Sequence, residues 1–153
     1  MKKIVIAPYS KKLRNGKENP KNYPKWQNLI NLLSKDYHII QLAMRGDYIF
    51  KNVEEKYELR DKQIKELIDE CEFWISVDTF LQHLVNSYNK KPGVVLWSQS
   101  DPEIFGYKYN INILKDRKYL RKNQYNIWEQ SEYVADAYMK SIEIVEKIKE
   151  KYD

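Results

Sequence analysis

Asp78 and Thr79 stand side by side between the apolar segment Phe73–Val77 and a stretch with helical spacing. In that position Asp78 can accept hydrogen bonds from backbone N–H groups of the first helical turn. Thr79 places a hydroxyl and an amide at the positive end of the helix, where an anion is favoured. His83 follows one turn later on the same helical face. The arrangement suits a phosphate, but it equally fits a plain helix cap followed by a half-buried helix histidine.

Cationic residues gather in one short segment of the chain, from Lys11 to Lys25. The segment has six cations and one acid, so its charge of +5 equals that of the whole chain. Such a cluster favours an anionic ligand near one loop over a whole-surface grip on nucleic acid. The alternative is a lysine-rich loop that only meets solvent. Because the segment follows the first predicted strand, Lys21 can reach a phosphate at the helix start, and Ser10 is a second donor.

Apolar segments of strand length alternate with segments of helical spacing. The predicted strands are Ile4–Ala7, His38–Leu42, Phe73–Val77, Val94–Trp97 and Asn110–Leu114. Pro24 is the predicted first residue of one helix, Asp61 is the predicted cap of the next, and Asp78-Thr79 opens a third. A long last helix is capped by Ser131. This order implies right-handed crossovers, and strands that are apolar throughout are typical of a parallel sheet. We therefore predict an α/β fold, a three-layer Rossmann-like parallel sheet of about five strands with helices on both faces, forming a single domain over residues 1–153.

In an open parallel sheet, ligands bind beyond the carboxyl ends of the strands, where the strand order reverses. Four predicted loops meet at that edge: Tyr9–Tyr23, Arg45–Arg60, Asp78-Thr79 and Ser98–Tyr107. We expect the site there.

Several classes of protein are disfavoured by composition. No apolar run approaches the roughly 18 residues of a membrane span. The start, Met1–Pro8, lacks the apolar region and cleavage site of a signal peptide, so we expect a first strand and a cytoplasmic protein. Cys71 is the single cysteine, which excludes an intrachain disulfide and a cysteine metal site, and we expect a buried thiol.

A second basic and aromatic stretch, from Lys115 to Tyr125, leaves nucleic acid as a weaker alternative partner. Tyrosines beside cations can hold single strands. The 13 tyrosines are scattered along the whole chain, however, and such a stretch also fits a solvated loop.

Three segments together resemble a known family. They are Lys21-Asn22-Tyr23-Pro24 (K-x-W-P in the family), Ile75–His83 (a strand ending D-T/S-G-x-x-H) and Pro92–Pro102 (P-x-V-x-L-F-G-x-T-D-P). Their order and spacing are similar to the carboxyl-terminal, donor-binding half of the ADP-heptose:lipopolysaccharide heptosyltransferases, glycosyltransferase family 9, of GT-B architecture. The resemblance extends from Lys3 to about Tyr119.

The resemblance implies a site for a nucleotide-diphosphate sugar, with no further cofactor and no metal. By matching position, it assigns Ser10 and Lys21 to the phosphates. It assigns Asp78 and Thr79 to the helix-terminus cradle and His83 to the support of that cradle. Asp47, on the loop after the second strand, is the candidate for the ribose.

Two features depart from the family pattern. Phe80 stands where the family has glycine, which lets a phosphate approach bare backbone. Either the diphosphate sits differently, or Phe80 stacks on a base or sugar, or the site has been lost. Second, the match lacks the half that normally binds the acceptor and carries the activating carboxylate, so no catalytic base is evident.

Three functions remain open at this point. The first is a module that binds a nucleotide or nucleotide sugar without turnover. The second is a glycosyltransferase completed by a homodimer mate or a partner chain. The third is a protein-interaction domain that kept the scaffold and lost the ligand.

Overall fold

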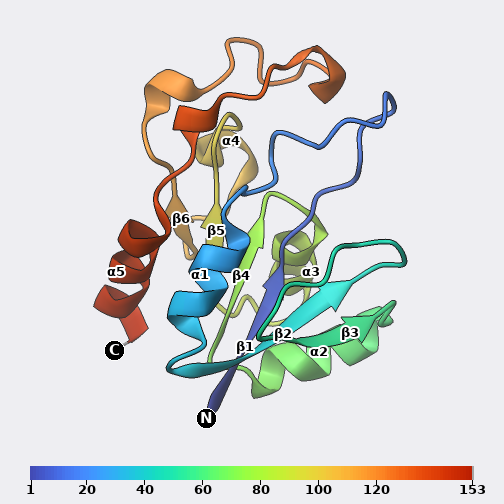
Figure 1. Cartoon of the computed structure of the whole chain (residues 1–153), viewed down its shortest axis with the longest axis vertical. Helices are drawn as coiled ribbons and strands as arrows, with labels where there is room; N and C mark the ends of the chain where they lie inside the picture. Colours follow the sequence, from blue (N-terminus) through green and yellow to red (C-terminus); the bar gives the residue numbers. More distant parts are fainter. Residues whose placement is uncertain (153) are drawn as a thin grey trace.

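The computed structural model of the protein describes residues 1–152, and its centre is one six-stranded sheet (Figure 1). The strands are β1 (Lys2–Ala7), β2 (Tyr37–Ala43), β3 (Glu54–Tyr57), β4 (Phe73–Val77), β5 (Val94–Leu96) and β6 (Ile111–Ile113). All neighbours pair in parallel, in the order β3-β2-β1-β4-β5-β6. This is the strand order of a Rossmann fold. The predicted α/β class is confirmed.

Helices cover both faces of the sheet, as predicted (Figure 1). On one face lie α1 (Trp26–Leu33) and α5 (Ser141–Tyr152), and on the other lie α2 (Asp61–Glu70) and α3 (Phe80–Tyr88). The short α4 (Pro102–Phe105) follows β5. No helix within residues 1–152 is long and apolar enough to cross a membrane.

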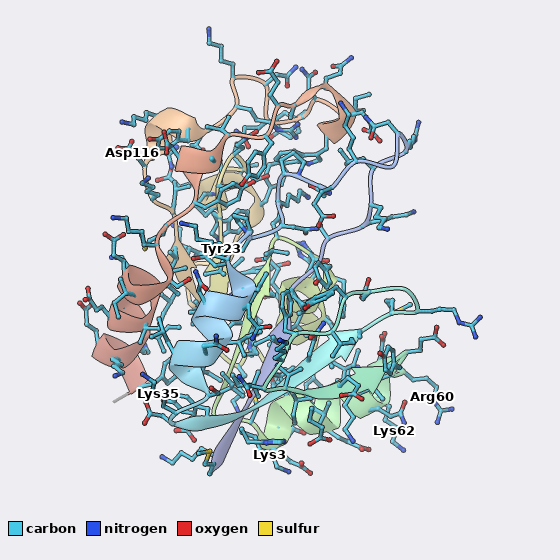
Figure 2. All side chains as sticks on the ribbon, in the orientation of Figure 1. Lys3, Tyr23, Lys35, Arg60, Lys62 and Asp116 are labelled. Carbon is cyan, nitrogen blue, oxygen red and sulfur yellow. The ribbon has the colours of Figure 1, made fainter. Side chains whose placement is uncertain are left out.

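Successive side chains of each strand point to opposite faces of the sheet, and this divides the core into two layers. In β1, Ile4 and Ile6 pack with α1 and α5, whereas Val5 and Ala7 pack with α2 and α3. Figure 2 shows charged side chains such as Lys3 and Lys62 on the outside of the molecule. Tyr23 lies inside, where its hydroxyl donates to the carbonyl of Met139 at 2.8 Å. The predicted burial of Cys71 is confirmed, and burial raises the pKa of its thiol to about 11.

The sequence pattern missed one strand and misplaced one helix. The edge strand β3 has the sequence Glu-Glu-Lys-Tyr, whose polar side chains carry no core signal. The prediction that Ser131 caps a long last helix is wrong, because α5 begins at Ser141. The preceding segment has three short 3₁₀ turns: Arg117–Tyr119, Trp128–Gln130 and Ala135–Ala137. Ala137, Tyr138 and Met139 of this segment are buried without an α-helix, whereas Val134 is exposed, so the helical spacing does not correspond to a helix here.

Two helix starts also differ from the prediction. Asp61 is the first residue of α2 rather than its cap, and the backbone N–H of Arg60 donates instead to the Gln63 side chain at 2.9 Å. Helix α1 begins at Trp26, two residues after Pro24.

Gly93 occupies a position that no side chain can share. A Cβ there would lie 2.1–2.6 Å from three ring atoms of Trp74, which is fully buried beneath it. We expect Gly93→Ala to lower the free energy of unfolding by about 1–3 kcal/mol, the usual cost of overpacking a core. Urea unfolding measures this. The exposed substitution Glu70→Ala is the control, and equal midpoints for the two variants would contradict the packing described here.

Candidate functional site

A cavity of about 920 Å³ opens at the carboxyl edge of the sheet. The loops after β1 and β2, the start of α2 and the start of α3 line it. Strand order reverses at β1, which lies between β2 and β4, so the cavity occupies the topological switch point. This is the position at which open parallel sheets bind ligands.

Both apolar and charged side chains line the cavity. Apolar lining comes mainly from Ala7, Leu42, Leu59 and Ile64. The cations are Lys11, Lys12, Arg45 and Lys56, and the acids are Glu18, Asp47 and Asp61. Four cations against three acids leave a small positive excess at the wall.

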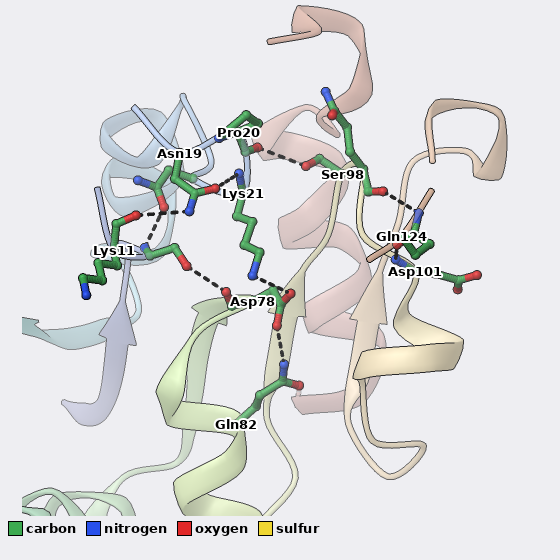
Figure 3. Close-up of polar contacts among 12 residues, drawn as sticks. Lys11, Asn19, Pro20, Lys21, Asp78, Gln82, Ser98, Asp101 and Gln124 are labelled. Atoms are coloured by element: carbon green, nitrogen blue, oxygen red, sulfur yellow. Dashed lines mark hydrogen bonds and ion pairs between the residues drawn. The ribbon is translucent and has the colours of Figure 1, made fainter. Parts of the chain in front are cut away.

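Three predicted site residues meet between the loop after β1 and the start of α3: Ser10, which lines the cavity, and Lys21 and Asp78, which do not (Figure 3). The ammonium of Lys21 lies 3.2 Å from a carboxylate oxygen of Asp78, and the two side chains are 22% and 10% exposed. The Ser10 hydroxyl donates to the backbone carbonyl of Asp78 at 3.0 Å. The loop after β1 is thereby fastened to the chain that enters α3.

Asp78 does not cap α3 as predicted. Instead of accepting from backbone N–H groups of the first turn, its carboxylate accepts from the Gln82 amide at 2.9 Å and pairs with Lys21 (Figure 3). Thr79 occupies the cap position and makes no side-chain cap bond. Within residues 1–152, no hydrogen bond uses the N–H of Phe80 or Leu81. The start of α3 therefore has free donors, and Thr79 and Phe80 line the cavity.

Phe80 lies at the cavity wall rather than across it. Its side chain is 47% exposed and belongs to the lining, while about 920 Å³ stays open. Within residues 1–152 the peptide N–H of Phe80 has no hydrogen-bond partner. Replacement of the family's glycine thus changes the shape of the wall without removing a donor.

Asp47 and His83 are placed very differently. Asp47 lines the cavity, and one of its carboxylate oxygens accepts from the Met44 amide at 2.8 Å in the turn after β2. His83 is exposed on α3 and does not line the cavity. Its Nδ1 lies 2.7 Å from the Tyr107 hydroxyl, so the structure does not bring it to the group around Asp78.

The cavity also has lining residues that the sequence pattern did not identify as site residues. Lys11 and Lys12 belong to the recognised basic segment, yet Lys21 was singled out, and Lys21 does not itself line the cavity. Arg45 lies on a loop expected at this edge and carried no other signal. Tyr9 also lines the wall, and its hydroxyl donates to the Tyr48 carbonyl at 3.1 Å. Burial raises the Tyr9 pKa, with Asp47 and Glu18 adding to the effect, so the phenol stays protonated.

In the second basic stretch, from Lys115 to Tyr125, Lys115, Arg117 and Arg121 form hydrogen bonds to other groups of the protein. Arg117 forms two hydrogen bonds to Asp101, at 2.7 and 3.1 Å, and these lower the pKa of that carboxyl. The Arg121 guanidinium lies 3.6 Å from the ring centroid of Trp128. The Trp128 ring also lies near the loop after β1, because the Lys21 ammonium lies 5.3 Å from the centroid of that ring. Within residues 1–152 no cluster of histidine, cysteine or acidic side chains could hold a metal ion.

The Lys21–Asp78 pair can be tested by a double-mutant cycle. Lys21→Met leaves the Asp78 carboxylate without its partner charge, and Asp78→Asn does the same to the Lys21 ammonium, although both groups are largely buried. The losses in the free energy of unfolding of the two single variants should therefore sum to more than the loss in the double variant. We expect a coupling energy of about 0.5–3 kcal/mol in urea unfolding. Additive single effects would show that the two groups do not interact.

Comparisons with known proteins agree with this architecture. No model of a protein family matches the sequence, and neither does any curated protein. Solved structures do match. Escherichia coli heptosyltransferase WaaC with ADP superposes with a TM-score of 0.67 and 18% identity, over 97% of this chain and 44% of that one. The dodecameric, iron-containing glycosyltransferase TibC from enterotoxigenic E. coli H10407 gives a TM-score of 0.71 and 14% identity over the same shares.

A second TibC structure, in complex with ADP-D-beta-D-heptose, gives a TM-score of 0.61 and 18% identity over 76% of this chain and 32% of that one. The chain thus spans less than half the length of these enzymes. The resemblance read from the sequence is confirmed at the level of fold: the chain shares the Rossmann-like architecture of heptosyltransferases.

Proposed function

We propose that this protein binds a nucleoside diphosphate, free or as a nucleotide-diphosphate sugar, in the cavity at the carboxyl edge of the sheet. The observation that carries the proposal is the meeting of free helix amides and a basic loop at one open cavity. Support comes from the fold shared with WaaC, whose structure contains ADP.

The diphosphate is assigned to the start of α3. The amide of Phe80 is a free donor at the positive end of a nine-residue helix, and Thr79 adds a hydroxyl beside it in the cavity lining. Lys11 and Lys12 line the same cavity and offset phosphate charge. Asp47, on the β2 loop, is the proposed partner of the ribose hydroxyls.

Lys21 has a supporting role in this proposal. Without it the Asp78 carboxylate would stand uncompensated next to the helix start, where it would repel a phosphate. The 3.2 Å ion pair cancels that charge and holds the β1 loop in position. Ser10 contributes in the same way through its bond to the Asp78 carbonyl.

Binding of ADP, measured by calorimetry, tests the proposal. We expect heat of binding for the unmodified chain and an affinity about ten- to hundredfold weaker for Lys11→Ala/Lys12→Ala, because charge-assisted phosphate contacts are lost. Affinity should also fall as salt is raised.

The matched control is Lys3→Ala/Lys35→Ala. It removes the same charge from exposed positions outside the cavity lining and should leave ADP affinity unchanged. Absence of heat with ADP and with the other nucleoside diphosphates would refute the proposal. An equal loss of ADP affinity in both double variants would show only nonspecific attraction between ADP and the positive charge of the protein.

A further inference from the structure

We infer that the Phe80 ring is the stacking surface for the nucleobase of the bound nucleotide. This inference rests on the proposed function and deepens it. It starts from an unusual placement, because Phe80, an aromatic residue that is 47% exposed, lies in the wall of the cavity.

Packing of the protein itself does not account for this ring. Leu81 and Val85, on the inner face of α3, are 0% and 1% exposed and fill the core beside α2. Phe80 belongs to neither core cluster. Within residues 1–152 it makes no aromatic or cation contact, although many other aromatic side chains of the protein do. An apolar ring left open at a cavity is available to a ligand.

The polarity of the lining indicates which part of the ligand meets the ring. Leu42, Leu59 and Ile64 bring apolar side chains from β2 and from the start of α2. Helices α2 and α3 pack side by side on the same face of the sheet, so Phe80 starts the helix next to this apolar wall. The cations Lys11 and Lys12 come from the β1 loop.

A nucleotide has matching parts. Its diphosphate suits the helix amides and lysines, whereas its flat base needs an apolar wall and a ring to stack on. The Phe80 N–H remains free, so one residue can serve both parts: its backbone the phosphate and its ring the base.

Calorimetry with ADP, ADP-heptose and inorganic pyrophosphate tests the assignment. Phe80→Leu keeps an apolar side chain but removes the aromatic face, and Phe80→Tyr keeps that face. With ADP we expect Phe80→Leu to bind about 5- to 150-fold more weakly, the range found when a stacking ring is lost, and Phe80→Tyr to bind like the unmodified chain. With inorganic pyrophosphate, which lacks a base, all three proteins should bind equally.

Three outcomes would overturn the inference. Equal ADP affinity in Phe80→Leu and the unmodified chain would show that the ring does not contact the base. A loss seen only with ADP-heptose, with ADP unaffected, would assign the ring to the sugar. Tighter pyrophosphate binding in Phe80→Gly would show that the ring obstructs the phosphates. If the unmodified chain binds neither ADP nor pyrophosphate, the proposed function itself fails, which separates the two claims.

Discussion

The segment after β1 and the start of α3 are held together by two side chains that both reach Asp78. Lys21 pairs with its carboxylate and Ser10 donates to its carbonyl. The contact is possible because β1 and β4 are parallel neighbours, so their carboxyl ends emerge side by side. Everything assigned to the cavity depends on this tie, since it positions the basic loop beside the free amides of α3.

The Lys21–Asp78 ion pair also determines which groups can attract an anion to the cavity. A lysine neutralised by a carboxylate adds little net attraction for an anion, so the attraction must come from other groups. In the proposed complex, Lys11 and Lys12 from the same loop supply it together with the helix terminus. The Lys21 ammonium is further enclosed by Trp128, from the segment between β6 and α5, which connects that segment to the site.

Much of the fold was readable from the sequence because its strands are buried on both faces. Phe73–Val77 is buried throughout and apolar except for Ser76, and its predicted bounds agree with those of β4. The edge strand β3 could not be read, because one side of an edge strand lacks a partner strand and its polar side chains meet solvent. The residues between Ser131 and Lys140 show helical spacing, yet they form no α-helix and contain only the 3₁₀ turn Ala135–Ala137, and tertiary contacts such as the bond from Gln99 to the Glu132 carbonyl hold the segment.

The site was partly readable for a related reason. Topology brings the ends of β1 and β4 together, so proximity of Ser10, Lys21 and Asp78 follows from the order of elements. The order of elements does not determine which neighbour a helical side chain contacts. His83 shares a helical face with Thr79 and yet contacts Tyr107, because the segment after β5 returns alongside α3. Individual lining cations such as Arg45 depend on loop conformation, which spacing does not encode.

We propose that the start of α3 receives the phosphates, and a titration of isotope-labelled protein with ADP, followed through the backbone amide signals, would locate them. We expect the largest shifts at Thr79, Phe80 and Leu81, with smaller ones at Lys11 and Lys12. Shifts confined to the basic stretch from Lys115 to Tyr125, with the α3 amides unmoved, would contradict it.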